Sequence, residues 1–211
     1  MNDDTPVLAA RDAEVVLDGT VLLAPTTLAV PPGEFRCLTG GNGTGKTTLL
    51  RAFQGTRRPT GGTVLVRGEP ADPARPRHRR LVAALVDPVP LARDLTVREQ
   101  TTLVAASWYG TTAATADRAE ETLDRLGLTA LGARFPGRLS AGQLQLLHLA
   151  LTLVRPADAL LLDEPERHLD ADRVALLAGL LADRARQGAA LLVATHEPAL
   201  TRACDAVTEL G

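Results

Sequence analysis

The stretch GGNGTGKT, residues 40–47, decides the fold that we expect for this chain. It fits the pattern G-x-x-x-x-G-K-[ST] and lies between an apolar segment, Phe35–Thr39, typical of a buried strand, and a helix that we expect to begin near Lys46. Glycines allow backbone conformations that a Cβ would block, so successive N–H groups can point at phosphate oxygens, and the helix adds its positive end. This context favours a phosphate-binding loop over a glycine-rich turn that carries a surface lysine.

The lysine of this loop is unusual for the chain. Lys46 is the only lysine among the 23 lysine and arginine residues, which suggests that an ammonium group is needed there. We expect Lys46 to contact the β- and γ-phosphates and the Thr47 hydroxyl to ligate Mg²⁺. The residues expected to bind the nucleotide in this loop are Gly40, Gly41, Asn42, Gly43, Thr44, Gly45, Lys46, Thr47 and Thr48.

The composition excludes several classes of protein. The chain has 211 residues, 45% of them hydrophobic, which is enough for one full α/β domain or two small ones. A formal net charge of -2 and 2% aromatic residues argue against a surface that binds nucleic acid. Two cysteines, Cys37 and Cys204, are too few for a disulfide framework and lack the spacing of metal ligands.

The hydrophobic pattern predicts an α/β fold over residues 1–211. Short apolar runs with Gly and Pro between them, over residues 5–34, indicate a small antiparallel sheet. Strands that alternate with helices through crossovers imply a parallel sheet. Residues 67–80 read as a solvated loop or short helix, and about 88–138 as a helical insertion. The other expected strands are Gly62–Val66, Leu81–Val86, Ala159–Leu162 and Ala189–Thr195, and the other helices are Gly142–Val154 and Ala171–Arg186.

A pair of acids follows one of these strands. The segment LLLDEP, residues 160–165, is an apolar strand that ends in Asp163 and Glu164. Buried strands rarely end in adjacent carboxylates unless something charged lies beyond them. We expect Asp163 to support Mg²⁺ and Glu164 to orient or deprotonate the attacking water. The alternative, two exposed acids that open a loop, loses weight because the phosphate loop lies upstream.

A third motif indicates a family. The segment LSAGQ, residues 139–143, closely resembles the Leu-Ser-Gly-Gly-Gln signature of ATP-binding cassette (ABC) ATPases. The order of the glycine-rich loop, this segment, the acid-tipped strand and then His196 resembles the nucleotide-binding domain of ABC transporters over essentially the whole chain. The resemblance implies a P-loop NTPase fold of ABC type. This fold has a mixed or parallel sheet core, an N-terminal antiparallel β subdomain and a helical subdomain.

The same resemblance implies roles that spacing alone cannot show. Ser140 and Gly142, with Gln143 beside them in the signature, would contact the γ-phosphate bound to a second subunit, so catalysis would require a dimer. His196 would hydrogen-bond the γ-phosphate and hold the attacking water, and Asp170 would communicate between the two sites. Without the family, Ser140 is a helix cap, and a lone histidine at a strand end is as often structural.

Two positions depart from the family pattern. Asp87 stands where the family has a glutamine, and Gln100 lies too far downstream to replace it. We expect Asp87 to reach the metal or the water, because carboxylate oxygens suit Mg²⁺. Leu17 stands where an aromatic residue stacks on adenine, and no aromatic residue precedes Phe35. Losing about 1 kcal/mol of stacking predicts weak discrimination between ATP and GTP.

The function expected from these residues is that of an ATPase that binds ATP and Mg²⁺ and powers an ABC transporter by ATP-driven dimer closure. One partner would be a second ABC ATPase subunit, identical or different. The other would be a separate transmembrane permease, docked near Asp87–Leu95, with Val89, Leu91 and Trp108 as candidate contacts.

The expected location follows from two absences in the sequence. No apolar run approaches the roughly 18 to 20 residues that span a bilayer, and the acidic N-terminus does not resemble a secretory signal. We therefore expect a cytoplasmic protein, held on the inner face of the membrane by its partner.

Three alternatives remain beside this function. A non-transport ABC-type ATPase is the first, but such proteins usually carry tandem domains or long insertions, and this sequence shows neither. A hydrolysis-impaired subunit of a heterodimeric transporter agrees with Asp87 and Leu17 but not with Glu164 and His196. A GTPase or small-molecule kinase would leave the signature segment unexplained.

Overall fold

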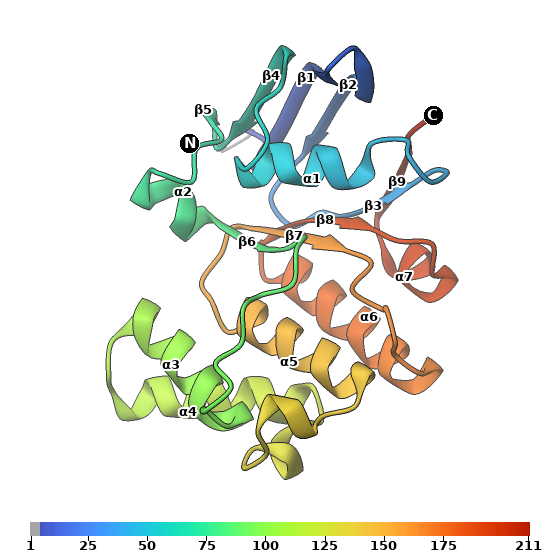
Figure 1. The fold of residues 1–211 in the computed structure, drawn as a ribbon. Helices are drawn as coiled ribbons and strands as arrows, with labels where there is room; N and C mark the ends of the chain where they lie inside the picture. Colours follow the sequence, from blue (N-terminus) through green and yellow to red (C-terminus); the bar gives the residue numbers. More distant parts are fainter. Residues whose placement is uncertain (1–4) are drawn as a thin grey trace.

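A computed structural model describes residues 5–211 and shows two β-sheets with helices between and below them (Figure 1). Residues 1–4, the acidic start of the chain, lie outside the described residues. Part of the expectation about a signal sequence depends on them. The two sheets and the helices on both sides confirm the predicted α/β fold.

The first sheet is antiparallel, with strand order β2-β1-β4-β5. The short apolar runs of residues 5–34 form two long strands, because the chain reverses only once, at Asp18 and Gly19. Both turn residues have positive φ, 49° and 77°, as a tight hairpin turn requires. The strands are β1 (Leu8–Leu17), β2 (Thr20–Val30), β4 (Gly61–Val66) and β5 (Glu69–Pro70).

The second sheet has the order β6-β7-β8-β3-β9, and every neighbouring pair is parallel. The predicted strand 81–86 is shorter than expected, because Leu81 ends a short helix that begins at Pro76. An edge strand, β9, was not predicted. The strands are β3 (Phe35–Thr39), β6 (Val82–Leu85), β7 (Ala159–Asp163), β8 (Ala190–Ala194) and β9 (Ala206–Glu209).

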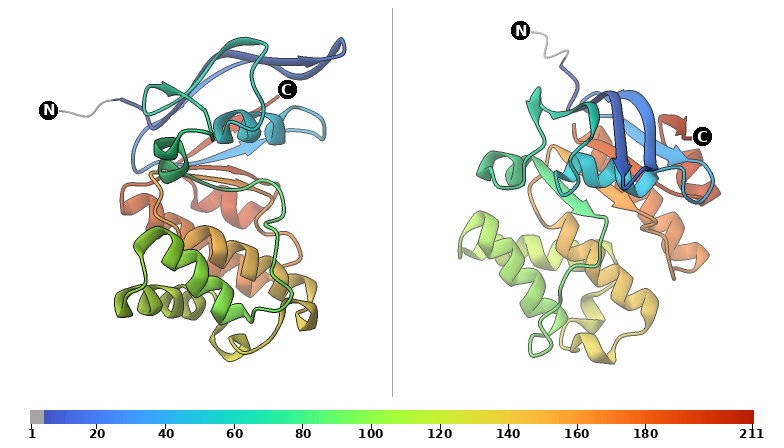
Figure 2. Two further views of the ribbon diagram at one scale, coloured as in Figure 1. Left: turned by 60° about the vertical axis from the view of Figure 1, so that its left-hand side comes forward. Right: turned by 45° about the horizontal axis from the view of Figure 1, so that its top comes forward.

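The helices cover both faces of the parallel sheet. Helix α1 (Lys46–Gln54) lies between the two sheets, whereas α5 (Ala141–Leu153) and α6 (Ala171–Arg186) cover the opposite face, as the views of Figure 2 also show. The remaining helices are α2 (Pro76–Leu81), α3 (Val97–Tyr109), α4 (Ala113–Arg125), α7 (Pro198–Ala203) and the 3₁₀ turns η1 (Thr129–Leu131) and η2 (Pro136–Arg138). No helix in the described part of the chain is long and apolar enough to cross a membrane.

Each face of the parallel sheet has its own hydrophobic core. Along β8, Leu191 and Val193 pack toward α5 and α6, whereas Leu192 and Ala194 pack toward α1 and the first sheet. This alternation is the two-residue period of a strand that is buried on both faces. A fully buried leucine contributes about 1.5–3 kcal/mol, so the two cores hold the sheet rigidly between its helices.

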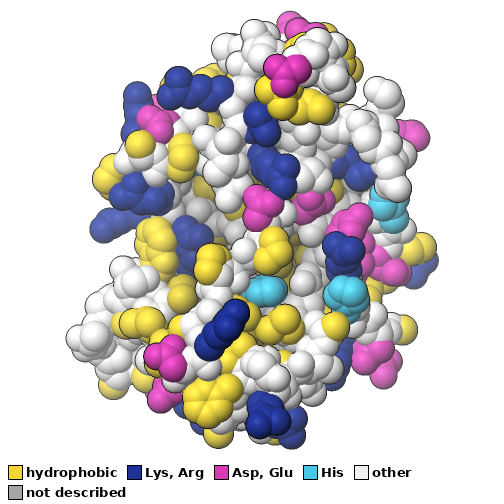
Figure 3. Space-filling model, in the orientation of Figure 1, with side chains coloured by type: hydrophobic (Ala, Val, Ile, Leu, Met, Phe, Trp, Pro, Cys, Tyr) yellow, Lys and Arg dark blue, Asp and Glu magenta, His cyan; other side chains and the backbone are white. Residues whose placement is uncertain are grey.

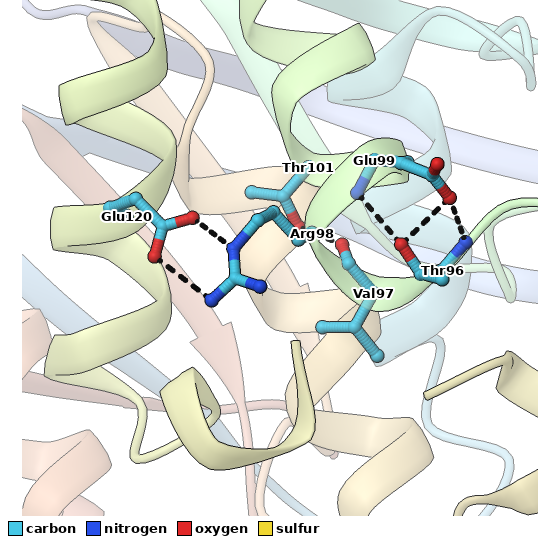
Figure 4. Close-up of polar contacts among 6 residues, drawn as sticks. All are labelled: Thr96, Val97, Arg98, Glu99, Thr101 and Glu120. Carbon is cyan, nitrogen blue, oxygen red and sulfur yellow. Dashed lines mark hydrogen bonds and ion pairs between the residues drawn. The ribbon is translucent and has the colours of Figure 1, made fainter. Parts of the chain in front are cut away.

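The helical part of the chain begins at a well-capped residue. The Thr96 hydroxyl accepts a hydrogen bond from Glu99 N (3.3 Å), and the Glu99 carboxylate accepts one from Thr96 N (2.8 Å), which forms a capping box at the start of α3 (Figure 4). Arg98 of α3 and Glu120 of α4 form an ion pair, with 2.5 Å between Nε and Oε1. The ion pair joins α3 to α4. Of the predicted helical stretch 88–138, residues 97–138 are mostly helical.

We expect the Thr96→Ala substitution to lower the free energy of unfolding by ~1 kcal/mol, because a backbone N–H at the start of α3 loses its acceptor. Urea denaturation measures this change. Ser107→Ala is the matched control, because Ser107 is an exposed hydroxyl on the same helix, and should change the free energy by less than ~0.5 kcal/mol. Equal effects of the two substitutions would contradict the capping role.

Candidate active site

The candidate residues gather at one edge of the parallel sheet. Because the strands run in the same direction, the segments that follow β6, β7, β8 and β3 all emerge at their carboxyl ends, where α/β sheets bind ligands. These segments carry Asp87, Glu164, His196 and the loop 40–45, and Asp163 is the last residue of β7. In Figure 3, acidic and basic side chains and histidines lie together across the middle of the face shown, between the antiparallel sheet and the helical part.

The glycine-rich loop leads from β3 directly into α1. Gly45 takes φ of +98° at the N-cap of α1, and a Cβ there would lie 2.8 Å from the carbonyl oxygen of Leu22, so only glycine fits. No described side chain caps α1, and its first turn carries no acid. The free N–H groups at the start of α1 are therefore available to an anion.

The two key side chains of α1 are already hydrogen-bonded within the chain. The buried Lys46 ammonium donates to the carbonyl oxygens of Gly40 (2.6 Å) and Gly41 (2.9 Å). The Thr47 hydroxyl donates to Asp163 Oδ2 at 2.6 Å, so the structure brings together the two residues from which a Mg²⁺ site is expected. Thr48 follows on α1 and is half-buried.

The two acids after β7 have different surroundings. Burial raises the pKa of the Asp163 carboxyl, and the hydrogen bond from Thr47 partly opposes this rise. Glu164 takes a φ of 45°, in the left-handed region that non-glycine residues rarely adopt, and its N–H donates to the Ala194 carbonyl oxygen at 2.9 Å. Such a conformation costs roughly 1–2 kcal/mol, and outliers of this kind cluster at functional sites.

A pocket of about 140 Å³ joins Asp87 to these acids. Helix α5 contributes Gln145 and His148 to its lining. Burial lowers the pKa of His148, and a hydrogen bond with the Val89 backbone partly opposes this. The lining residues are Leu85, Val86, Asp87, Pro88, Gln145, His148, Asp163, Glu164 and Arg167.

Asp87 forms an ion pair with Arg51 of α1, with 2.6 Å between Oδ1 and Nη2. The hydrogen bond with Asp87 raises the pKa of Arg51, and the guanidinium offsets the negative charge that Asp87 brings to the site. Gln100 is buried and braces the loop before α3 instead. It accepts a hydrogen bond from Ala92 N and donates one to the Leu95 carbonyl oxygen, both at 3.0 Å.

The signature segment forms the start of α5, on the sheet face opposite to α1 (Figure 1). Ser140 and Gln143 form a capping box, in which the Ser140 hydroxyl accepts from Gln143 N (3.3 Å) and the Gln143 side chain accepts from Ser140 N (3.1 Å). Gly142 is buried, and a Cβ there would lie 2.6 Å from the His168 carbonyl oxygen. This glycine therefore allows α5 to pack closely against the segment that leads to Asp170.

Three predicted residues lie at the margins of the site. His196 is exposed two residues after the end of β8, and Asp170 caps α6 by accepting a hydrogen bond from Arg173 N at 3.0 Å. Leu17 is 45% exposed at the end of β1. A hollow of about 320 Å³ beside the glycine-rich loop is lined by Val21–Ala24, Asn42–Thr44 and Gly211, so Leu17 lies outside its lining.

Three residues of the site were missed from the sequence: Arg51, His148 and Glu166, whose carboxylate accepts a hydrogen bond from Thr195, the residue before His196. Arg51 lies four residues after Thr47, so helical spacing placed both on one face of α1 and could have indicated it. His148 and Glu166 depend on contacts between distant segments, which no local pattern shows.

The Arg51–Asp87 pair is exposed, so we expect it to contribute only ~0.2–1 kcal/mol to stability. A double-mutant cycle with Arg51→Gln and Asp87→Asn, followed by urea denaturation, measures this coupling energy. The coupling should fall as salt rises, because exposed charges are screened. Additive effects of the two substitutions on the free energy of unfolding at low salt would show that Arg51 and Asp87 do not stabilise each other.

Comparisons with known proteins agree with this geometry. The family model for ABC transporters matches residues 23–167, more than half of the chain. The chain is 34% identical over 205 residues to the cytochrome c biogenesis ATP-binding export protein CcmA 2 of Salmonella paratyphi A, covering 97% of this chain and 96% of that protein. It is 36% identical over 185 residues to the methionine import ATP-binding protein MetN of Cereibacter sphaeroides, covering 85% of this chain and 52% of that protein.

Solved structures show the same fold. An ATP-binding subunit of an ABC transporter superposes with a TM-score of 0.85 at 28% identity, covering 97% of this chain and 85% of that one. The cbiO1 protein of Clostridium perfringens, described as part of the ABC transporter complex cbiONQ, has a TM-score of 0.83 at 27% identity, covering 98% and 85%. The chain belongs to the ABC transporter family, as one of its ATP-binding subunits, and is an ATPase.

Proposed function

We propose that this chain binds ATP and Mg²⁺ at the edge of its parallel sheet and hydrolyses ATP to drive a separate transmembrane permease. One observation carries the proposal. The Thr47 hydroxyl at the start of α1 and the Asp163 carboxylate at the end of β7 meet at 2.6 Å, next to the only lysine of the chain. Two segments far apart in sequence thus supply the two kinds of oxygen that a nucleotide-bound magnesium ion needs.

ATP would occupy the glycine-rich loop. The backbone N–H groups of residues 40–48 and the Lys46 ammonium would take the β- and γ-phosphates, in place of the carbonyl oxygens that Lys46 now contacts. Thr47 and Asp163 would hold Mg²⁺. Within residues 5–211 no group of three or more His, Cys, Asp or Glu side chains could hold a metal ion alone, so phosphate oxygens would complete the coordination. The ion would supply positive charge to the phosphate oxygens.

The acids and the histidine at the edge would act on water. Glu164, at the rim of the pocket, would orient or deprotonate the attacking water, and His196 would hold it against the γ-phosphate. Asp87 would reach the metal or the water when its ion pair with Arg51 opens, which the small free energy of an exposed pair allows.

A second subunit would complete each site. Ser140, Gly142 and Gln143 start α5 on the sheet face opposite to the glycine-rich loop's helix, so they would contact nucleotide bound to another copy or a related subunit. The positive end of the α5 dipole at this helix start would favour an anion, although the capping box already pairs the N–H groups of Ser140 and Gln143. Asp170, at the start of α6 nearby, would communicate between the two sites.

A transmembrane partner would dock beside the helical subdomain, residues 88–138 of a single domain covering 1–211, and would hold the chain at the inner face of the membrane. Val89 and Leu91 are half-buried in the segment after Asp87 and would contact this partner. Trp108 is less suited, because Arg155 stacks on its ring, with 4.6 Å from the guanidinium carbon to the ring centre. Likeness to cbiO1, described as part of a transporter complex, supports such an assembly.

We expect Glu164→Gln to bind ATP with unchanged affinity and to accumulate as a dimer, but to hydrolyse ATP at least ~100-fold more slowly, because the base is lost. Steady-state phosphate release and size-exclusion chromatography with ATP measure the two effects. Glu121→Gln is the matched control, since Glu121 is an exposed acid on α4. Undiminished hydrolysis by Glu164→Gln would overturn the role of this residue.

We expect ATP and GTP to bind within about fivefold of each other, because no aromatic ring at position 17 stacks on the base and such stacking contributes ~0.5–1.5 kcal/mol. Leu17→Tyr should tighten the binding of nucleotides about fivefold if the base lies there. Competition with a fluorescent nucleotide measures both values. A strong preference of the unmodified chain for ATP would count against this prediction.

A further inference from the structure

Glu166 lies two residues after Glu164, and its carboxylate reaches the segment that carries His196. The Thr195 hydroxyl donates a hydrogen bond to Glu166 Oε1 at 2.5 Å. The same hydroxyl accepts a hydrogen bond from Glu197 N at 2.9 Å. Thr195 directly precedes His196, and Glu197 directly follows it. Through the Thr195 hydroxyl, both neighbours of His196 are thus linked to the Glu166 carboxylate.

A second link joins the same two segments. The Glu164 N–H donates to the carbonyl oxygen of Ala194 at 2.9 Å, one residue before Thr195. Within the turn after β7, Arg167 N donates to the Glu164 carbonyl oxygen at 3.1 Å, which holds Glu166 between them. The segments of Glu164 and His196 are therefore joined by one backbone bond and by the Glu166 side chain.

Stability alone does not explain a carboxylate at this position. Its Oε2 atom is buried and has no hydrogen-bond partner among the described residues, so the loss of its hydration is not recovered. Burial also raises the pKa of Glu166, although the hydrogen bond from Thr195 and backbone hydrogen bonds of Glu166 and His196 oppose the rise. An apolar residue would avoid this cost but could not accept the bond from the fully buried Thr195 hydroxyl.

We propose that Glu166 is a positioning residue, which acts through Thr195 to hold His196 in register with Glu164. This inference rests on the proposed function, in which Glu164 and His196 act together on the attacking water. Glu166 itself need not touch the nucleotide. Removing it should therefore lower kcat and leave nucleotide binding, which depends on residues 40–48, unchanged.

The test compares four single variants of the purified chain and the double variant Glu166→Ala/Thr195→Val. Glu166→Ala removes the acceptor, Glu166→Gln keeps an acceptor oxygen but removes the charge, and Thr195→Val removes the donor while keeping the shape. Thr101→Val is the matched control, because Thr101 is equally buried and its hydroxyl donates to the Val97 carbonyl oxygen (2.8 Å) inside α3, away from the site (Figure 4).

Glu166→Ala and Thr195→Val should each lower kcat about 10- to 100-fold, because small misplacements of a reacting group cost this much. KM and the affinity for ATP should change less than twofold. The double variant should be no slower than either single one, Glu166→Gln should recover most of the rate, and Thr101→Val should match the unmodified chain.

A structural readout separates this inference from the proposed function. The readout is the NMR chemical shift of the His196 ring protons, which are assigned by comparison with His196→Ala. This shift should change in Glu166→Ala and Thr195→Val and remain nearly unchanged in Glu166→Gln. If the unmodified chain does not hydrolyse ATP, the proposed function is wrong, and this signal still tests the positioning of His196.

Two results would overturn the inference. The first is a kcat of Glu166→Ala and Thr195→Val equal to that of Thr101→Val, with an unmoved His196 signal. The second is a Glu166→Gln variant as slow as Glu166→Ala, which would mean that the charge itself takes part in the reaction. Thermal unfolding of each variant separates either result from a loss of the fold.

Discussion

The parallel hydrogen bonding of β6, β7, β8 and β3 is the constraint on which the rest of the structure depends. Leu85 pairs with Leu162, Asp163 with Ala194, and Leu38 with Ala194, so the four strands end almost level with one another. Every loop that follows them emerges at the same edge, whatever its sequence. A shift of register in one strand would move an acid or the histidine along this edge, away from the glycine-rich loop.

Two hydrophobic cores prevent such a shift. The side chains of β7 and β8 alternate between the core under α1 and the core over α5 and α6, so a slip by one residue would exchange the two sets. Helix α1 is held between both sheets, which fixes Thr47 over the end of β7. The positions of the polar groups at the edge are therefore determined by apolar packing several residues away.

The sequence predicted those parts of the site that local patterns encode. The loop 40–47 is recognisable because its residue types and spacing meet the demands of one ligand, and Asp163 because a buried strand rarely ends in an acid. Strand β9 was missed because its four residues are half exposed and form no apolar run. Glu166 was missed for a different reason: its partner Thr195 lies 29 residues away and becomes its neighbour only when β7 and β8 pair.

Lys46 and Thr47 already form hydrogen bonds within the chain, so a ligand that binds them exchanges existing hydrogen bonds for new ones. A phosphate oxygen that binds Lys46 must replace a carbonyl oxygen that the chain already supplies, and a metal ion that binds Thr47 and Asp163 must replace the hydrogen bond between them. Net gains in such exchanges are about 0.5–1.5 kcal/mol each, or about 1.5–3 kcal/mol where a charged group takes part, well below the strength of an isolated bond. The affinity for the nucleotide is then the sum of many small contributions over the loop. It should therefore fall stepwise as the ligand carries fewer phosphates.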